Sequence, residues 1–178
     1  MNMIEDQPLP VRFQAACALE KILKIEKAMS LIKPKLDVIL KCYLGLMHEL
    51  DNEELVAAFE SLMTIFQDDI GPYAAEICLH LRKQYQRLIA QDAQEDEGES
   101  ILAAVASFTS IRRILDAIQD DKSLLLQVED IIYPCLLHSL TPDGLDAIEE
   151  GIDCITMLVY HLYKDDKPLS ENLWKLYP

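Results

Sequence analysis

Apolar side chains recur along this chain at intervals of three and four residues, the spacing of one face of an α-helix. The clearest run falls within residues 36–50 and comprises Leu36, Ile39, Leu40, Tyr43, Leu46, Met47 and Leu50. Few segments alternate apolar and polar residues with the period of two that a half-buried strand needs. The pattern therefore predicts an all-α fold.

Helical stretches suited to opening a repeated unit begin near Pro10, Asn52, Ile101 and Asp143, at spacings of 42, 49 and 42 residues. A period of ~40–47 residues is typical of HEAT and armadillo arrays, which stack helix pairs into a solenoid. We expect the whole chain to be one segment of a HEAT-repeat (armadillo-like) α-solenoid, wound as a right-handed superhelix. Its approximate repeats are 10–50, 52–91, 100–140 and 142–178. The last repeat is read as incomplete, so the sequence is expected to be an internal piece of a longer array.

Two sets of residues carry the signals of helix starts. Asp51 and Glu54 have the spacing of a capping box, in which the side chain of each residue accepts a hydrogen bond from the backbone N–H of the other. Thr141 precedes Pro142, so we expect its hydroxyl to cap the helix that follows.

For the last two long helices, the sequence predicts a specific break in one and a specific buried face in the other. Pro134 lies inside the helix predicted over 122–140, and it should kink that helix or divide it near Ile132. The helix predicted to follow Thr141 is expected to turn six apolar residues inward: Leu145, Ile148, Ile152, Ile155, Val159 and Leu162.

The charge balance is strongly acidic. Lys and Arg number 16 and Asp and Glu 31, for a net charge of −15. Such a surface repels nucleic acid and anionic lipid and attracts basic proteins, although solubility alone is an alternative explanation. The chain has no uncharged apolar stretch of the ~18 residues that a membrane span needs, and its first ten residues lack the pattern of a secretory signal. We expect a soluble intracellular protein that binds neither nucleic acid nor membranes directly.

Motifs for catalysis, cofactors and metals are missing from the sequence. It contains no GxSxG, P-loop, GxGxxG, HExxH or CxxC. The five cysteines are at least 19 residues apart and sit in apolar helical patterns, so we expect buried, reduced thiols. These features predict a binding protein rather than an enzyme, with no cofactor and no metal site.

An acidic segment at 91–99 interrupts the helical pattern and is expected to be a flexible loop. Its carboxylates are candidate partner-binding groups: Asp92, Glu95, Asp96, Glu97 and Glu99. They could wrap a basic partner, or occupy a basic site on the same chain formed by residues expected to face outward, Arg82, Lys83 and Arg87. The alternative is an unstructured connector.

A second acidic set lies further along the chain. Asp143, Asp146, Glu150 and Asp153 are spaced by three, four and three residues, which places them on one face of the predicted last long helix, with Glu149 beside them. This acidic ridge is a candidate surface for a basic segment, and the alternative is the solvated face of an amphipathic helix.

Four stretches resemble the karyopherin-β nuclear transport receptors, close to the importin seven and importin eight branch. They are LPVRFQAACALEKIL at 9–23, HELDNEELVAAFESLMTIFQDDIGPYAAEICLHLRKQYQRLI at 48–89, DAQEDEGES at 92–100 and NLWKLYP at 172–178. Their unbroken order along nearly the whole chain is more specific than any one of them.

The resemblance implies a nuclear import receptor that carries basic cargo, such as ribosomal proteins or histones, and shuttles between cytoplasm and nucleus through the nuclear pore. It also implies contact with Phe-Gly repeats of nucleoporins and release by the GTPase Ran, the latter through repeats that this chain lacks. Phe-Gly binding needs shallow apolar gaps between outer helices. The candidate outer helices contain Phe13, Phe59, Phe108 and Ile152, whose spacing favours core packing. A HEAT scaffold or regulatory subunit without transport is the alternative function.

Overall fold

Helices account for nearly all of the chain that the structure describes. The computed structural model describes residues 8–50, 52–92, 99–163 and 169–176, with the side chains of residues 53, 91, 92 and 99–104 left aside. Within these ranges it contains no β-strand, and the helices pack in pairs. The predicted all-α fold of HEAT type is confirmed. The superhelix and the repeat boundaries stay predictions.

The chain divides into two compact units, Met1–Gln67 and Asp68–Pro178. The first unit contains α1 (Leu9–Leu23), α2 (Glu26–Ile32), the 3-10 turn η1 (Lys33–Lys35), α3 (Leu36–Glu49) and α4 (Glu53–Ile65). Tyr43 ties its core together, because its buried hydroxyl donates to the Ala16 carbonyl oxygen at 2.7 Å while its ring lies 6.0 Å from that of Phe59. This single side chain thus joins α3 to both α1 and α4.

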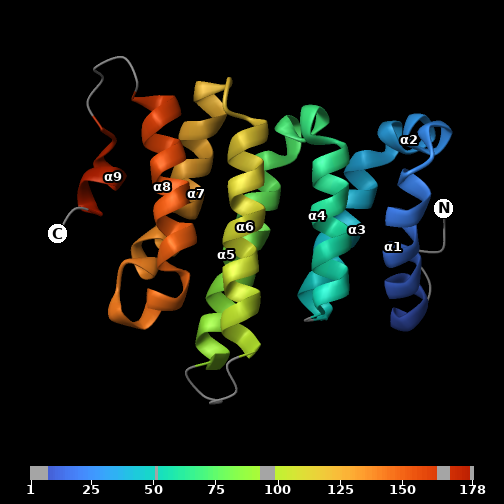
Figure 1. Ribbon diagram of the computed structural model, residues 1–178, viewed down its shortest axis with the longest axis horizontal. Coiled ribbons are helices and arrows are strands. Elements are labelled where there is room, and N and C mark those ends of the chain that lie inside the picture. Colours follow the sequence, from blue (N-terminus) through green and yellow to red (C-terminus); the bar gives the residue numbers. More distant parts are fainter. Residues whose placement is uncertain (1–7, 51, 93–98, 164–168, 177–178) are drawn as a thin grey trace. The chain divides into compact units, whose positions relative to one another are not determined.

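The second unit consists of two layers of helices. Its elements, from the boundary turn η2 (Gln67–Asp69) onward, are η3 (Gly71–Tyr73), α5 (Ala74–Asp92), α6 (Glu99–Ala117), α7 (Lys122–Ser139), η4 (Pro142–Ala147), α8 (Ile148–Leu162) and α9 (Glu171–Lys175). In Figure 1, α6 and α8 lie in front of α5 and α7, and each helix packs on a neighbour within its own layer and on one in the other. The Tyr85 and Phe108 rings meet edge to face between α5 and α6, with centroids 5.0 Å apart.

The start of α4 differs from the predicted capping box. Asn52 is the N-cap, and its side-chain oxygen accepts a hydrogen bond from the Leu55 backbone N–H at 3.1 Å. The box assigned the cap to Asp51, which lies outside the described residues. Asn and Asp are about equally good N-caps, so their order along the chain could not decide between the two positions.

Helix α7 runs without a break from Lys122 to Ser139, with Pro134 inside it. The predicted division near Ile132 is therefore wrong, and the alternative, a kink at Pro134, stays a prediction. The residues around the proline are buried: Ile132, Cys135 and Leu136. Because the helix packs against α5 and α8 there, burial of these side chains outweighs the one backbone hydrogen bond that proline cannot donate.

The chain turns tightly between α7 and α8. Thr141 is the N-cap residue of η4, but its hydroxyl makes no capping hydrogen bond, because it donates back to the His138 carbonyl oxygen at 2.7 Å. Residues 142–147 form a 3-10 helix instead of the first turns of a continuous α-helix. Gly144 lies so close to the end of α7 that a Cβ atom there would be 2.7 Å from the His138 carbonyl carbon. The close approach explains the tighter winding and the need for glycine.

The inward face of α8 is rotated from the predicted one. Its buried residues are Gly151, Cys154, Leu158 and Leu162. Of the six apolar residues expected inside, three are exposed: Leu145, Ile152 and Val159. The prediction placed the large apolar residues inside. The contact between α7 and α8 is instead made by small residues, Gly151 and Ser139, which let the two backbones approach each other.

Gly151 offers a direct test of this packing. A Cβ atom at Gly151 would lie 2.8 Å from the Cβ of Ser139, a buried residue of α7, whereas one at Gly45 in α3 would meet nothing within 4 Å. Overpacking a helix contact costs about 1–3 kcal/mol, and Gly→Ala in an open helix position gains about 0.5–1 kcal/mol. We expect Gly151→Ala to lower the free energy of unfolding and Gly45→Ala to raise it, measured by urea titration. Equal effects of the two substitutions would contradict the close contact.

The cysteine prediction is largely confirmed. Cys17, Cys78, Cys135 and Cys154 are buried and not in disulfides, whereas Cys42 is half-buried. Burial raises the pKa of the Cys135 thiol to about 12, with Arg82 acting in the opposite direction. Burial likewise raises the pKa of Cys154 to about 12, and Asp153 adds to the shift. The thiolates, which are the reactive forms, are therefore suppressed in the folded chain.

Two measurements follow from these thiol pKa values. In the native chain near pH 8, Cys42 should react first with a thiol reagent, and Cys78, Cys135 and Cys154 should react only on unfolding. An unfolded thiol loses its proton near the ordinary cysteine pKa of 9.0, while Cys135 and Cys154 in the folded chain hold theirs to about 12. The free energy of unfolding should therefore be unaffected by them below pH 9.0 and fall as the pH rises toward 12. Rapid native labelling of all five cysteines would contradict the described burial.

Candidate partner-binding surface

The loop acids fall at the edge of what the structure describes. Asp92 is the last residue of α5 and Glu99 the first of α6. Glu95, Asp96 and Glu97 lie outside the described residues. The partner role of all five stays a prediction.

The residues that were expected to form a basic site for that loop are not all exposed. Arg82 and Arg87 are half-buried, and of the three only Lys83 is exposed. The Arg82 guanidinium donates to the Ile131 carbonyl oxygen on α7 at 3.4 Å. Arginine can bury its aliphatic stem while its guanidinium stays hydrogen-bonded to polar groups, so an outward-facing assignment based on charge alone misses such half-buried positions. The three residues therefore do not form an exposed basic cluster.

The acidic ridge is divided between two elements. Asp143 and Asp146 belong to η4, whereas Glu149, Glu150 and Asp153 belong to α8. The prediction of one continuous helical face is wrong, because the chain is wound as a 3-10 helix up to Ala147. The five residues still follow one another along the surface of a single connected segment, and all but the half-buried Glu150 are exposed.

The carboxylates of the ridge have different surroundings. Asp153 accepts a hydrogen bond from the Arg112 guanidinium of α6 at 3.1 Å, and both side chains of this ion pair are about half exposed. Glu149 and Glu150 occupy the first turn of α8, where the positive end of the helix dipole stabilises them. Asp153 is thus partly neutralised, and the remaining four supply most of the local negative charge.

Exposed apolar side chains lie in the same segment as the acidic ridge. Leu145 and Ile152, which alternate with the ridge acids along the chain, are 56% and 48% exposed. The segment 143–153 therefore offers carboxylates and apolar groups together. The sequence pattern contained this information, but the apolar positions were assigned to the core.

A buried carboxylate that sequence reasoning missed holds the end of the second unit together. Glu129 of α7 is 2% exposed, and it accepts hydrogen bonds from the Tyr163 hydroxyl at 3.1 Å and from the Ser170 hydroxyl. The Ser170 backbone N–H donates to the Tyr163 oxygen at 3.1 Å, and the Ser170 Oγ caps α9 by accepting from Leu173 N–H. Burial, assisted by Glu129, raises the pKa of Tyr163. The signal in the sequence that could have revealed this buried carboxylate is its position, an acidic residue inside an otherwise apolar stripe of α7.

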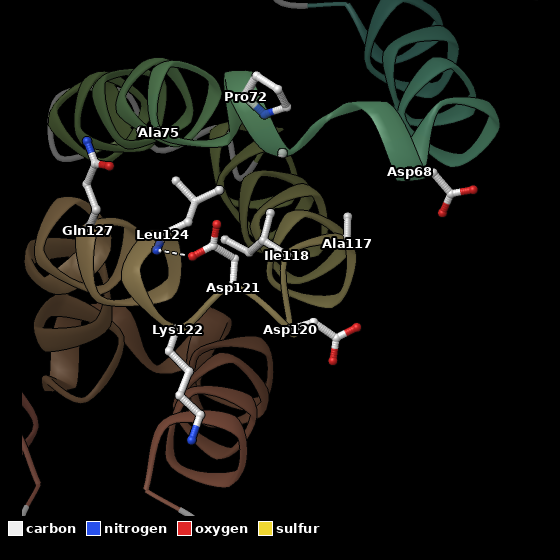
Figure 2. A pocket seen from close by; sticks show the side chains of 11 residues that line it. Asp68, Pro72, Ala75, Ala117, Ile118, Asp120, Asp121, Lys122, Leu124 and Gln127 are labelled. Atoms are coloured by element: carbon white, nitrogen blue, oxygen red, sulfur yellow. Dashed lines mark hydrogen bonds between the residues drawn. The ribbon is translucent and has the colours of Figure 1, made fainter.

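The second unit also contains an open depression of about 870 Å³, formed where the starts of α5 and α7 meet the end of α6. Figure 2 shows its lining, which combines apolar and acidic side chains. The principal members are Ala75, Ile118, Leu124, Asp68 and Asp120.

One acid of this depression is held in place by the backbone. Asp121 is the N-cap of α7, and its Oδ1 accepts from the N–H groups of Ser123 and Leu124 at 3.1 and 3.0 Å. Asp120 and Asp68 are exposed. An open gap lined by apolar and acidic side chains, together with Lys122 and Gln127, is therefore present where α5, α6 and α7 meet.

This gap is only partly in a helix proposed as an outer one, because Ala117 at the end of α6 lines it. Phe59 and Phe108 are fully buried, as their spacing predicted, whereas Ile152 is exposed. The depression is lined by the starts of α5 and α7 and by the end of α6, the helix that also contains Phe108, whereas none of its lining residues belongs to α8, which contains Ile152.

Two other features are missing from the described residues. No group of three or more His, Cys, Asp or Glu side chains there is placed to hold a metal ion. No helix within those same ranges is long and apolar enough to cross a membrane.

Comparison with known proteins gives relatives across the whole chain. It is 27% identical over 178 residues, all of the chain, to a protein described as a probable importin-7 homolog of Dictyostelium discoideum, and covers 16% of it. It is 31% identical over 175 residues, 97% of the chain, to an importin beta-like SAD2 homolog of Arabidopsis thaliana, covering 17% of that protein. Importin-8 of Homo sapiens is 22% identical over 176 residues, 98% of the chain and 16% of importin-8.

The chain thus spans about a sixth of the length of these relatives. No family model matches the chain, and no solved structure matches it. The aligned residues run from one end of the chain to the other, and the helical-repeat fold agrees with them. The chain belongs to the importin-β superfamily.

Proposed function

We propose that this chain is the part of a nuclear import receptor that contributes to binding basic protein cargo, such as ribosomal proteins or histones. The receptor would carry the cargo between cytoplasm and nucleus through the nuclear pore. It would bind Phe-Gly nucleoporins on the way, and Ran would act through other repeats of the receptor. Relatives named as importins and a net charge of −15 support this function.

The observation that carries the proposal is the surface formed by η4 and the start of α8. Asp143, Asp146, Glu149 and Glu150 add four negative charges next to the exposed side chains of Leu145 and Ile152. Exposed ion pairs contribute about 0.2–1 kcal/mol each, so the four together give a modest affinity that salt weakens. Reversible binding of this strength suits a carrier that must release its load.

Electrostatics also governs how fast cargo is found. A strongly acidic surface attracts a basic partner over about one Debye length, ~8 Å at physiological salt, and raises the rate of association. The apolar groups beside the acids then add contact energy that salt does not screen. Binding should therefore weaken with salt without disappearing at physiological ionic strength.

The test uses the purified chain and a lysine-rich histone segment, titrated from low to physiological salt by fluorescence anisotropy. We expect the combined variant Asp143→Asn, Asp146→Asn, Glu149→Gln and Glu150→Gln to bind roughly tenfold or more weakly at low salt, because it loses the pairings of three exposed acids and of the half-buried Glu150. The dependence of affinity on salt should also become shallower.

A matched control removes the same amount of charge elsewhere. The exposed acids Glu26, Glu54, Glu76 and Asp116, changed to the corresponding amides, leave the ridge intact. If this control variant weakens binding as much as the ridge variant, the charge acts only in bulk and the ridge is not the cargo surface.

A further inference from the structure

One part of this acidic chain has the opposite charge. Residues 21–35 contain five lysines and a single carboxylate, Glu26, and therefore a local net charge of +4 in a chain of net charge −15. The stretch covers the end of α1, all of α2 and η1. In Figure 1 these elements lie together at one end of the first unit, where the chain turns from α1 toward α3.

The same stretch exposes three large apolar side chains. Leu31 is 75% exposed, Ile25 58% and Ile22 46%, and Leu31 exceeds every other large apolar residue of the described chain in exposure. Helix α2 contains no buried residue at all. Burial therefore does not explain why these positions are apolar, although exposed apolar groups cost solubility.

The backbone holds these groups in a defined place. Ile25 is the N-cap of α2 in an extended conformation, and its carbonyl oxygen accepts from the N–H groups of Ala28 and Met29 at 2.8 and 3.2 Å. Leu23, which precedes it by two residues, is buried and anchors the end of α1. The exposed side chains thus project from an ordered turn.

The lysines are largely available to a partner. Lys21, Lys27 and Lys35 are exposed. The ion pair of Lys24 with Glu20 is at 3.8 Å, and such exposed pairs contribute little. We propose that the turn formed by α2 and its flanking residues 21–35, the basic turn, is a docking site for an acidic protein segment that carries large apolar side chains.

The whole-chain charge favours a short peptide over other polyanions. A nucleic acid or an anionic membrane extends far beyond the basic turn and would meet the surrounding negative charge. An acidic segment only a few residues long stays within about a Debye length of the lysines. Leu31 and Ile25 also provide apolar contact that a phosphate backbone does not use.

The experiment measures binding of a labelled glutamate-rich peptide that contains one leucine and one phenylalanine, at ~50 and ~150 mM salt. We expect Lys27→Gln combined with Lys35→Gln to weaken binding roughly fivefold or more, as loss of two exposed pairings predicts. We expect Leu31→Ser to weaken it by up to about tenfold and, unlike the lysine variant, to leave the salt dependence unchanged.

Matched controls separate a local site from general charge. Lys41→Gln combined with Lys83→Gln removes two exposed lysines outside the basic turn and should leave affinity unchanged. A peptide with serine in place of its two apolar residues should bind the native chain more weakly. Circular dichroism should show equal helix content and thermal midpoints for all variants.

Three results would overturn the proposal. The first is no binding of the acidic peptide at low salt. The second is equal loss of binding in the basic-turn and control lysine variants. The third is tighter, Lys27- and Lys35-dependent binding of an oligonucleotide or of phosphatidylserine vesicles, which would assign the basic turn to another class of partner.

Discussion

Close backbone contact between α7 and the segment after it is the constraint on which the second unit depends. Small residues make this contact: Gly144 lies against the end of α7, and Gly151 lies against Ser139. With α8 this close, Cys154 reaches the Phe108 carbonyl of α6 and Arg112 reaches Asp153. The tight 3-10 winding of η4 leaves Leu145 outside, and the rotation of α8 leaves Ile152 outside. The composition of the candidate cargo surface is thus a consequence of how the core packs.

Local patterns were sufficient to predict the helices and the fold class. Residues 36–49 form α3 with an almost continuous buried stripe, because their periodicity is regular and Gly45 makes no close contact that would turn another face inward. In α8, large apolar residues were available on one face and small ones on another, and only the neighbouring helix determines which face packs. Pro134 shows the same limit, because burial around it keeps α7 continuous.

Other features depend on partners far away in the sequence. Glu129 is buried because Tyr163 and Ser170, 34 and 41 residues further on, donate hydrogen bonds to it. Arg82 turns to a carbonyl oxygen 49 residues away. The basic turn was visible in the sequence, but a net charge calculated over the whole chain concealed it.

In the proposed function, basic cargo contacts the carboxylates of η4 and the start of α8. Zero-length carbodiimide cross-linking of the chain to a lysine-rich histone segment, followed by mass spectrometry, identifies the carboxylates in contact with lysines. We expect cross-links concentrated at Asp143, Asp146, Glu149 and Glu150. Cross-links distributed over exposed acids in proportion to their number, or concentrated in the first unit, would contradict this claim.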